Sequence, residues 1–113
     1  MKKIEVIIPD RALPELNGLL REANIGGMTR YRVEGRGRGK AKSVSVGRGT
    51  SQYVPEFIPR TKVEVVVSDS QAEDVLGRIL DRLGGPTYGG KVFVSDMPVA
   101  IDLITRERGE GAI

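Results

Sequence analysis

The chain has 113 residues, a net charge of +3 and a hydrophobic content of 39%, enough apolar material for one domain spanning residues 1–113. It contains neither cysteine nor histidine, which excludes disulfides, thiolate metal sites and histidine-based acid–base catalysis. Glu5 and Pro9 interrupt the start far short of a signal-peptide core, and no run reaches membrane-spanning length, so we expect a soluble cytoplasmic protein.

The first part of the chain predicts a strand, a helix and a second strand. Residues 2–8 alternate as a strand does, and Pro14 suits a first helical turn. The apolar residues that recur at helical spacing around it are Leu13, Leu16, Leu19, Leu20 and Ala23. Residues 24–27 (Asn-Ile-Gly-Gly) end this helix, and residues 28–33 predict the second strand.

Residues 36–53 predict a long loop. Five of them are basic and none is acidic, and glycines at positions 35, 37 and 39 disfavour a helix or a core strand. Nine of the 18 basic residues lie between Arg30 and Lys62, so this region should attract an anionic ligand or partner. Loops of this length in compact domains are usually functional or disordered.

The second part predicts a strand, a helix and two further strands. Residues 62–67 form the clearest strand pattern, and Ser70 with Glu73 predicts a capping box. The apolar stripe of the following helix comprises Val75, Leu76, Ile79, Leu80 and Leu83. Residues 84–86 (Gly-Gly-Pro) end that helix, and residues 91–95 and 99–104 predict the last strands.

This order predicts an α+β, ferredoxin-like βαββαβ sandwich with a long loop between strands 2 and 3 and a short extra C-terminal strand. Two helices cover only one face of such a sheet. Because Ile7 and Val66 fall on the other face, we expect that face to be apolar and to be covered by oligomerisation.

Several motifs in this order resemble the PII signal-transduction proteins from end to end. They are residues 1–5 (MKKIE), 27–29 (GMT), 33–38 (VEGRGR), 53–60 (YVPEFIPR), 62–67 (KVEVVV), 89–94 (GGKVFV) and 106–113 (RERGEGAI). The resemblance implies a homotrimer with adenine-nucleotide sites in the clefts between subunits. It also implies that residues 36–53 form a loop that engages a transporter or a metabolic enzyme.

Residues 85–91 match the P-loop spacing, but Val92 replaces the Ser or Thr that would reach magnesium, and a strand follows instead of a helix. The segment 84–91 is therefore either a simple glycine-rich turn or an anion-binding loop. Gly89 and Gly90 allow backbone N–H groups to approach a phosphate, and Lys91 adds a charge. The resemblance implies that this is the phosphate-binding loop.

The resemblance implies further nucleotide contacts. Arg38, with Gly35 and Gly37, matches the phosphate-contacting arginine, although a lone surface arginine is ordinarily only solvated. The adenine pocket would comprise Met28, Thr29, Glu64 and Val66. Core and strand filling explains Met28 and Val66 equally well. Tyr53 aligns with a tyrosine that some members carry nucleotidylated, or it is an exposed aromatic at a strand start.

The sequence also departs from the family. Two phosphate-contacting arginines fall on Asp102 and Ile104, and the glutamine that helps bind magnesium and 2-oxoglutarate falls on Gly39. Arg60 replaces a lysine that pairs with 2-oxoglutarate. Arg106 and Arg108, in a C-terminal tail at residues 105–113, are candidates to restore the lost charge.

These departures count against a magnesium-ATP and 2-oxoglutarate response. We expect a non-enzymatic regulator in nitrogen or carbon metabolism that binds ADP or AMP at least as well as magnesium-ATP. Its small-anion effector would lie near Gly39 and Arg60, with bicarbonate as one candidate. The alternative is an RNA-binding ferredoxin-like module, for which the 4% aromatic content is low. An enzyme is disfavoured because no nucleophile–base pair or paired carboxylates can be identified.

Overall fold

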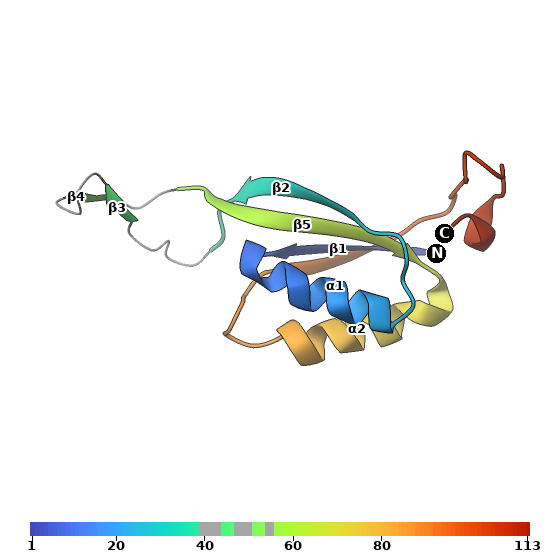
Figure 1. Cartoon of the computed structure of the whole chain (residues 1–113), viewed down its shortest axis with the longest axis horizontal. Helices are drawn as coiled ribbons and strands as arrows, with labels where there is room; N and C mark the ends of the chain where they lie inside the picture. Colours follow the sequence, from blue (N-terminus) through green and yellow to red (C-terminus); the bar gives the residue numbers. More distant parts are fainter. Residues whose placement is uncertain (39–43, 47–50, 54–55) are drawn as a thin grey trace.

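The computed structural model describes residues 1–38 and 56–113, and the backbone of two short strands at 44–46 and 51–53. These residues form an antiparallel sheet with two α-helices on one face (Figure 1). The elements in chain order are β1 Lys2–Ile8, the 3₁₀ turn η1 Asp10–Ala12, α1 Leu13–Glu22, β2 Thr29–Gly35, β3 Val44–Val46, β4 Ser51–Tyr53, β5 Ile58–Val67, α2 Asp69–Leu83, β6 Lys91–Asp96 and the 3₁₀ turn η2 Gly109–Ala112. The predicted α+β, ferredoxin-like class is confirmed.

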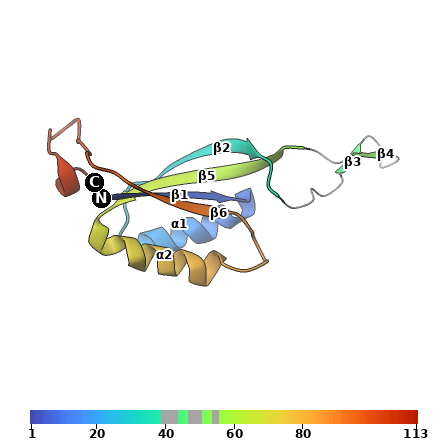
Figure 2. The same cartoon turned by 180° about the vertical axis from the view of Figure 1, so that it is seen from behind.

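The main sheet has the strand order β2-β5-β1-β6, and every neighbouring pair is antiparallel. The strands β2 and β6 are its two edges, and the edge strand β6 is seen in the view from behind (Figure 2). In the register of the central strand β1, Ile4 lies opposite Val65 of β5 and Val94 of β6. Residues opposite one another share a face, so this register decides which side chains meet.

The core lies between the sheet and the two helices. Alternate residues of β1 and β5 are buried there, as the predicted period-two pattern requires. The buried apolar residues include Ile4, Val6 and Ile8 of β1, Val63, Val65 and Val67 of β5, Leu16, Leu19 and Leu20 of α1, and Val75, Ile79 and Leu83 of α2. Each fully buried aliphatic side chain contributes about 1.5–3 kcal/mol. Among the described residues, no helix has the length and apolar character needed to cross a membrane.

Helix α2 differs from its prediction in two details. Ser68 and Gln71 form the cap, because Gln71 Oε1 accepts hydrogen bonds from the Ser68 N–H at 3.3 Å and the Ser68 hydroxyl at 3.0 Å. The capping box predicted at Ser70 and Glu73 is therefore wrong. Leu80, placed in the apolar stripe, is 68% exposed because it lies beyond the edge of the core.

The predicted strand at residues 99–104 is also wrong, since this segment makes only an isolated β-bridge between Ile101 and Arg108. Asp102 Oδ1 instead accepts the backbone N–H groups of Ile104 at 2.7 Å and Thr105 at 3.1 Å. Such side-chain bonds compete with a strand ladder. The β-branched run consequently becomes a turn, at whose tip Leu103 and Ile104 are each 93% exposed.

The segment at residues 36–53 is more than a plain loop. The strands β3 and β4 pair antiparallel, with Val44 opposite Tyr53 and Val46 opposite Ser51. Short alternations of β-branched or aromatic residues with serine and glutamine favour such a pair, which we had not predicted. Residues 39–43, 47–50 and 54–55, including Gly39, and the Tyr53 side chain lie outside the described residues.

The second face of the sheet mixes apolar and charged side chains, because Phe93 and Tyr31 lie opposite Glu5 and Lys62 on it. Ile7 and Val66 do lie on it, but the register intersperses Lys3, Glu5, Lys62 and Glu64 among them. Lys62 Nζ lies 3.7 Å from Glu5 Oε1 and 3.6 Å from Glu64 Oε1. Oligomerisation through this face therefore stays a prediction.

Gly77 within α2 and Gly84, which caps its C-terminus, should respond oppositely to substitution by alanine. Alanine at the exposed position Gly77 meets no atom within 4 Å, so Gly77→Ala should stabilise the helix by about 0.5–1 kcal/mol. A Cβ at Gly84 would lie 2.3 Å from the Leu80 carbonyl oxygen, so Gly84→Ala should destabilise by about 1 kcal/mol or more. Urea unfolding at one protein concentration measures both. Equal effects of the two substitutions would contradict this account of the helix end.

Candidate functional site

The segment between α2 and β6, residues 84–91, has a backbone that depends on its glycines. Gly85, Gly89 and Gly90 have positive φ angles of 99°, 74° and 116°. A Cβ on Gly90 would lie 2.2 Å from the Ile7 carbonyl oxygen, so only glycine lets this loop close against the end of β1. Lys91 follows at once, exposed and opposite Ile7.

Arg11 anchors this loop, and sequence reasoning missed it. Its Nη2 donates a hydrogen bond to the Thr87 carbonyl oxygen at 2.8 Å. Its guanidinium carbon lies 5.1 Å from the centre of the Tyr88 ring, within cation–π range. Only the three-dimensional proximity of η1 to the loop reveals this role, because Arg11 and Thr87 are 76 positions apart.

The segment that follows β2, residues 36–38, lies toward the same end of the sheet as residues 84–91 (Figure 1). Gly35 ends β2 opposite Ile58, and Arg38 is exposed. The return to β5 is held by an ion pair of Arg36 Nη1 with Glu56 Oε1 at 2.5 Å.

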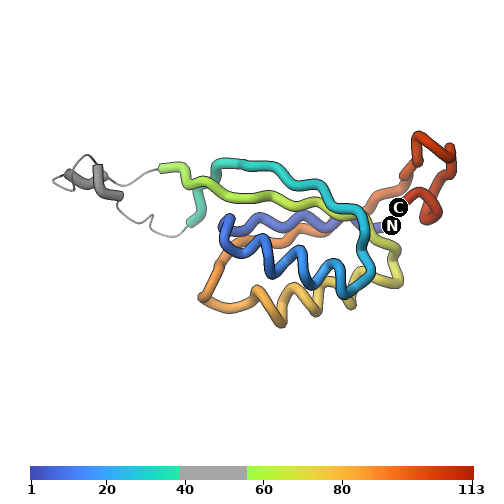
Figure 3. The backbone as a smooth tube through the Cα atoms, in the orientation of Figure 1, coloured from blue at the N-terminus to red at the C-terminus, as the bar shows by residue number. Residues whose placement is uncertain are grey.

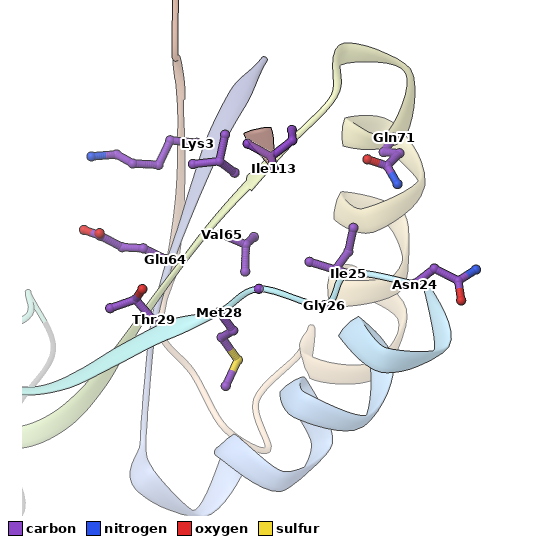
Figure 4. Close-up of a pocket in the computed structure, with 12 residues that line it drawn as sticks. Lys3, Asn24, Ile25, Gly26, Met28, Thr29, Glu64, Val65, Gln71 and Ile113 are labelled. Carbon is purple, nitrogen blue, oxygen red and sulfur yellow. The ribbon is translucent and has the colours of Figure 1, made fainter. Parts of the chain in front are cut away.

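The predicted adenine-pocket residues lie at the other end of the sheet, around a cavity of about 550 Å³ (Figure 4). Of the predicted set, Met28, Thr29, Glu64 and Val66 all line it. Sequence reasoning missed the other lining residues, which are Lys3, Asn24, Ile25, Gly26, Gly27, Val65, Gln71 and Ile113. For these residues, sequence reasoning provided only the prediction that the first helix ends at residues 24–27.

The cavity has an apolar side, a polar side and a free strand edge. Figure 4 shows Ile25 and Met28 on one side of β5, and Lys3, Thr29 and Glu64 directed to the other. Pairing of β2 with β5 begins at Thr29 opposite Glu64. The peptide groups of β5 beyond Glu64 are therefore not covered by β2 and border the cavity.

A single chain does not bring the two groups of residues together. The loop after α1 and the loop before β6 lie at opposite ends of the two-layer body (Figure 3). Val66 lies opposite Lys3 and Lys91 opposite Ile7, which places Val66 and Lys91 four residues and two strands apart, roughly 16 Å between Cα atoms. Gly89, Gly90 and Lys91 border a different cavity, which shares no residue with the first.

The C-terminal segment, which contains Arg106 and Arg108, lies near both termini, at the end of the sheet that carries the cavity at Met28 (Figure 1). Both are exposed, and Arg106 has a positive φ of 67°. Its N–H donates to the Asp102 carbonyl oxygen at 2.8 Å, which closes the Asp102 turn. Neither arginine forms an ion pair within the described part of the chain.

Charged residues beside the cavity form a connected network. Lys3 Nζ lies 3.0 Å from Glu5 Oε1, and the Tyr31 hydroxyl donates to Glu64 Oε1 at 2.6 Å. Lys3 lowers the pKa of Glu5 below its ordinary value by hydrogen bonding and charge attraction. Contact with Tyr31 raises the pKa of Lys62, and Glu5 and Glu64 add to that effect. Arg60 is at the far end of this face, opposite Val33.

Comparison with known proteins gives one family. The sequence model for "Nitrogen regulatory protein P-II" matches residues 1–107. Proteins of that name are 40% identical in Rhizobium meliloti, 38% in Nostoc punctiforme and 37% in Rhodobacter capsulatus, each over the full length of both chains.

The chain belongs to the P-II family. P-II proteins are signalling regulators and not enzymes. The family binds adenine nucleotides, and it consists of trimeric regulators of partner proteins. Among the residues that the structure describes, no group of three or more histidine, cysteine, aspartate or glutamate residues is placed to hold a metal ion.

The network of Lys3 and Glu5 predicts a pH dependence. Because the folded pKa of Glu5 is lowered, its contribution to stability is present above its ordinary value of 4.5 and is lost as pH falls through the folded pKa. In thermal unfolding between pH 7 and pH 3, Glu5→Gln should be less stable than the wild type at pH 7, and the two should converge at low pH. A constant difference across this range would contradict the ion-pair assignment.

Proposed function

We propose that this single-domain P-II protein, residues 1–113, is a cytoplasmic homotrimer that binds adenine nucleotide between subunits. Met28, Thr29, Glu64 and Val66 of one subunit would hold the base and sugar. The phosphates would bind to residues 84–91 of its neighbour, with Gly35, Gly37 and Arg38. The observation that carries this proposal is the separation of the two groups at opposite ends of one chain.

The cavity at Met28 suits a purine. Its apolar side offers a surface on which a planar base can pack, and the uncovered edge of β5 offers peptide N–H and C=O groups. A purine edge presents both hydrogen-bond donors and acceptors, so a strand edge can bind it without a charged side chain. This arrangement is compatible with the adenine nucleotides that the family binds.

The proposed phosphate-binding residues, which we call the phosphate half of the site, suit a short polyphosphate chain. Gly89, Gly90, Lys91 and Arg38 supply donors and two positive charges for the first phosphates. Asp102, where relatives would place a phosphate-contacting arginine, instead holds its own turn through the N–H groups of Ile104 and Thr105. It adds negative charge rather than a donor, so ADP or AMP should bind at least as well as magnesium-ATP.

The bound nucleotide would act on a partner through residues 36–53. A ligand that binds one arrangement of the chain better than another shifts the population toward it. Arg38 joins the phosphate half to the start of this segment, so nucleotide occupancy and partner contact would be linked. A transporter or metabolic enzyme is the proposed partner, and a small anion such as bicarbonate near Gly39 and Arg60 is the proposed effector.

Calorimetry with purified protein tests the nucleotide preference. ADP and AMP should bind at least as tightly as magnesium-ATP, and 2-oxoglutarate should add little to ATP binding. Lys91→Ala should weaken all three nucleotides by roughly ten- to a hundredfold, the effect of one charge-assisted contact. Arg78→Ala, which removes a cation paired with Asp74 outside both cavities, should leave binding unchanged.

Tight magnesium-ATP binding that 2-oxoglutarate strengthens would contradict the proposed preference. It would indicate that Arg106, Arg108 or Arg60 supplies the missing phosphate and effector contacts. Failure of all three nucleotides to bind would contradict the proposed function itself.

A further inference from the structure

Tyr31 is tied to the wall of the adenine cavity, although it lines neither cavity. It lies in the middle of β2, directly opposite Lys62 of β5. Its hydroxyl donates to Glu64 Oε1 at 2.6 Å, and Lys62 Nζ lies 3.6 Å from the same oxygen. Lys62 Nζ also lies 5.5 Å from the centre of the Tyr31 ring. The Glu64 carboxylate is thus held from one side by a hydroxyl and a cation.

This contact leaves the second carboxylate oxygen available. The Tyr31 hydroxyl contacts only Oε1 of Glu64, and Glu64 borders the cavity beside Thr29. An ionised carboxylate is an acceptor only, so a ligand group that binds Oε2 must be a donor. The phosphates of a nucleotide are largely ionised at neutral pH, whereas the two ribose hydroxyls and the adenine amino group are donors.

The register places the ribose near Glu64. In the proposed function, the base lies against the apolar side of the cavity. It contacts the uncovered edge of β5 at Val65 and Val66, the residues that follow Glu64. Glu64 precedes them on β5, on the side of the cavity that Figure 4 shows facing away from Ile25. The group attached to the base is the sugar, so the sugar is the part of the ligand next to the carboxylate.

We propose that Tyr31 is a positioning residue that orients the Glu64 carboxylate to accept the ribose hydroxyls, and thereby selects ribonucleotides over nucleotides that lack them. The inference rests on the proposed adenine-nucleotide function. Without the Tyr31 hydroxyl, the glutamate side chain regains rotamer freedom, part of which is lost again when the sugar binds. The effect is therefore confined to ligands that offer the hydroxyls.

The test compares ADP with 2′,3′-dideoxy-ADP by calorimetry on the full-length protein. The wild type should bind ADP more tightly than the dideoxy nucleotide. Tyr31→Phe, which removes only the hydroxyl, should weaken ADP roughly three- to tenfold, and dideoxy-ADP should be unaffected. Glu64→Gln should also reduce the discrimination, and adding Tyr31→Phe to it should have little further effect because both residues act on one contact.

Thr61→Val is the matched control. The Thr61 hydroxyl donates to Asp10 Oδ1 at 2.6 Å, also from β5 to a carboxylate, but it lies outside both cavities. This variant should lower the stability of the protein and leave the ratio of the two affinities unchanged. A hydroxyl that only stabilises the fold would not change the ratio of the ADP and dideoxy-ADP affinities. A changed ratio in Tyr31→Phe therefore indicates a role in ligand selection.

Equal weakening of both nucleotides by Tyr31→Phe, or no weakening of either, would overturn the inference. So would a wild type that binds ADP and dideoxy-ADP equally. A wild type that binds neither nucleotide would overturn the proposed function and this inference with it. Should Tyr31→Phe not fold, an unchanged affinity ratio in Glu64→Gln would overturn the inference by itself.

Discussion

The antiparallel pairing of β1 with β5 and β6 is the constraint on which the geometry of both half-sites depends. It holds Val66 against Lys3 at one end of β1 and Lys91 against Ile7 at the other. A shift of one residue would move the buried valines of β5 to the solvent face, so the core enforces this register. The separation of the cavity at Met28 from residues 84–91 therefore follows from core packing, and the proposed nucleotide site needs two subunits for this reason.

The same register gives the two faces of the sheet different roles. The face under the helices is apolar and stabilises the fold, whereas the opposite face carries the network of Lys3, Glu5, Lys62 and Glu64. Charged residues on a subunit surface favour a specific partner arrangement over non-specific association. Glu64 belongs to this network and also borders the cavity at Met28, so the charged face and the proposed nucleotide site meet at one carboxylate.

Prediction from sequence succeeded where a local pattern determines the structure. The helical spacing of Leu16 and Leu19 and the alternation of Val63 and Val65 gave the main elements and most of the core. Prediction failed where a residue distant in the sequence, or a competing local hydrogen bond, determines the structure. Residues 99–104 have strand propensity, but Asp102 draws their N–H groups into a turn. The contact of Tyr31 with Glu64 could not be seen without the register of β2 on β5.

Subunit complementation tests the two-chain site most directly. Lys91→Ala removes the phosphate half, and Met28→Glu places a carboxylate in the apolar part of the adenine cavity. Each variant alone should bind ADP poorly. When the two are unfolded together and refolded at equal amounts, random assembly should restore about a quarter of the sites, because a site is intact only where two unmodified halves meet. Recovery of that ADP-binding capacity is the expected result. A mixed sample that binds no better than its parents would show that one chain forms the whole site, and would contradict the account.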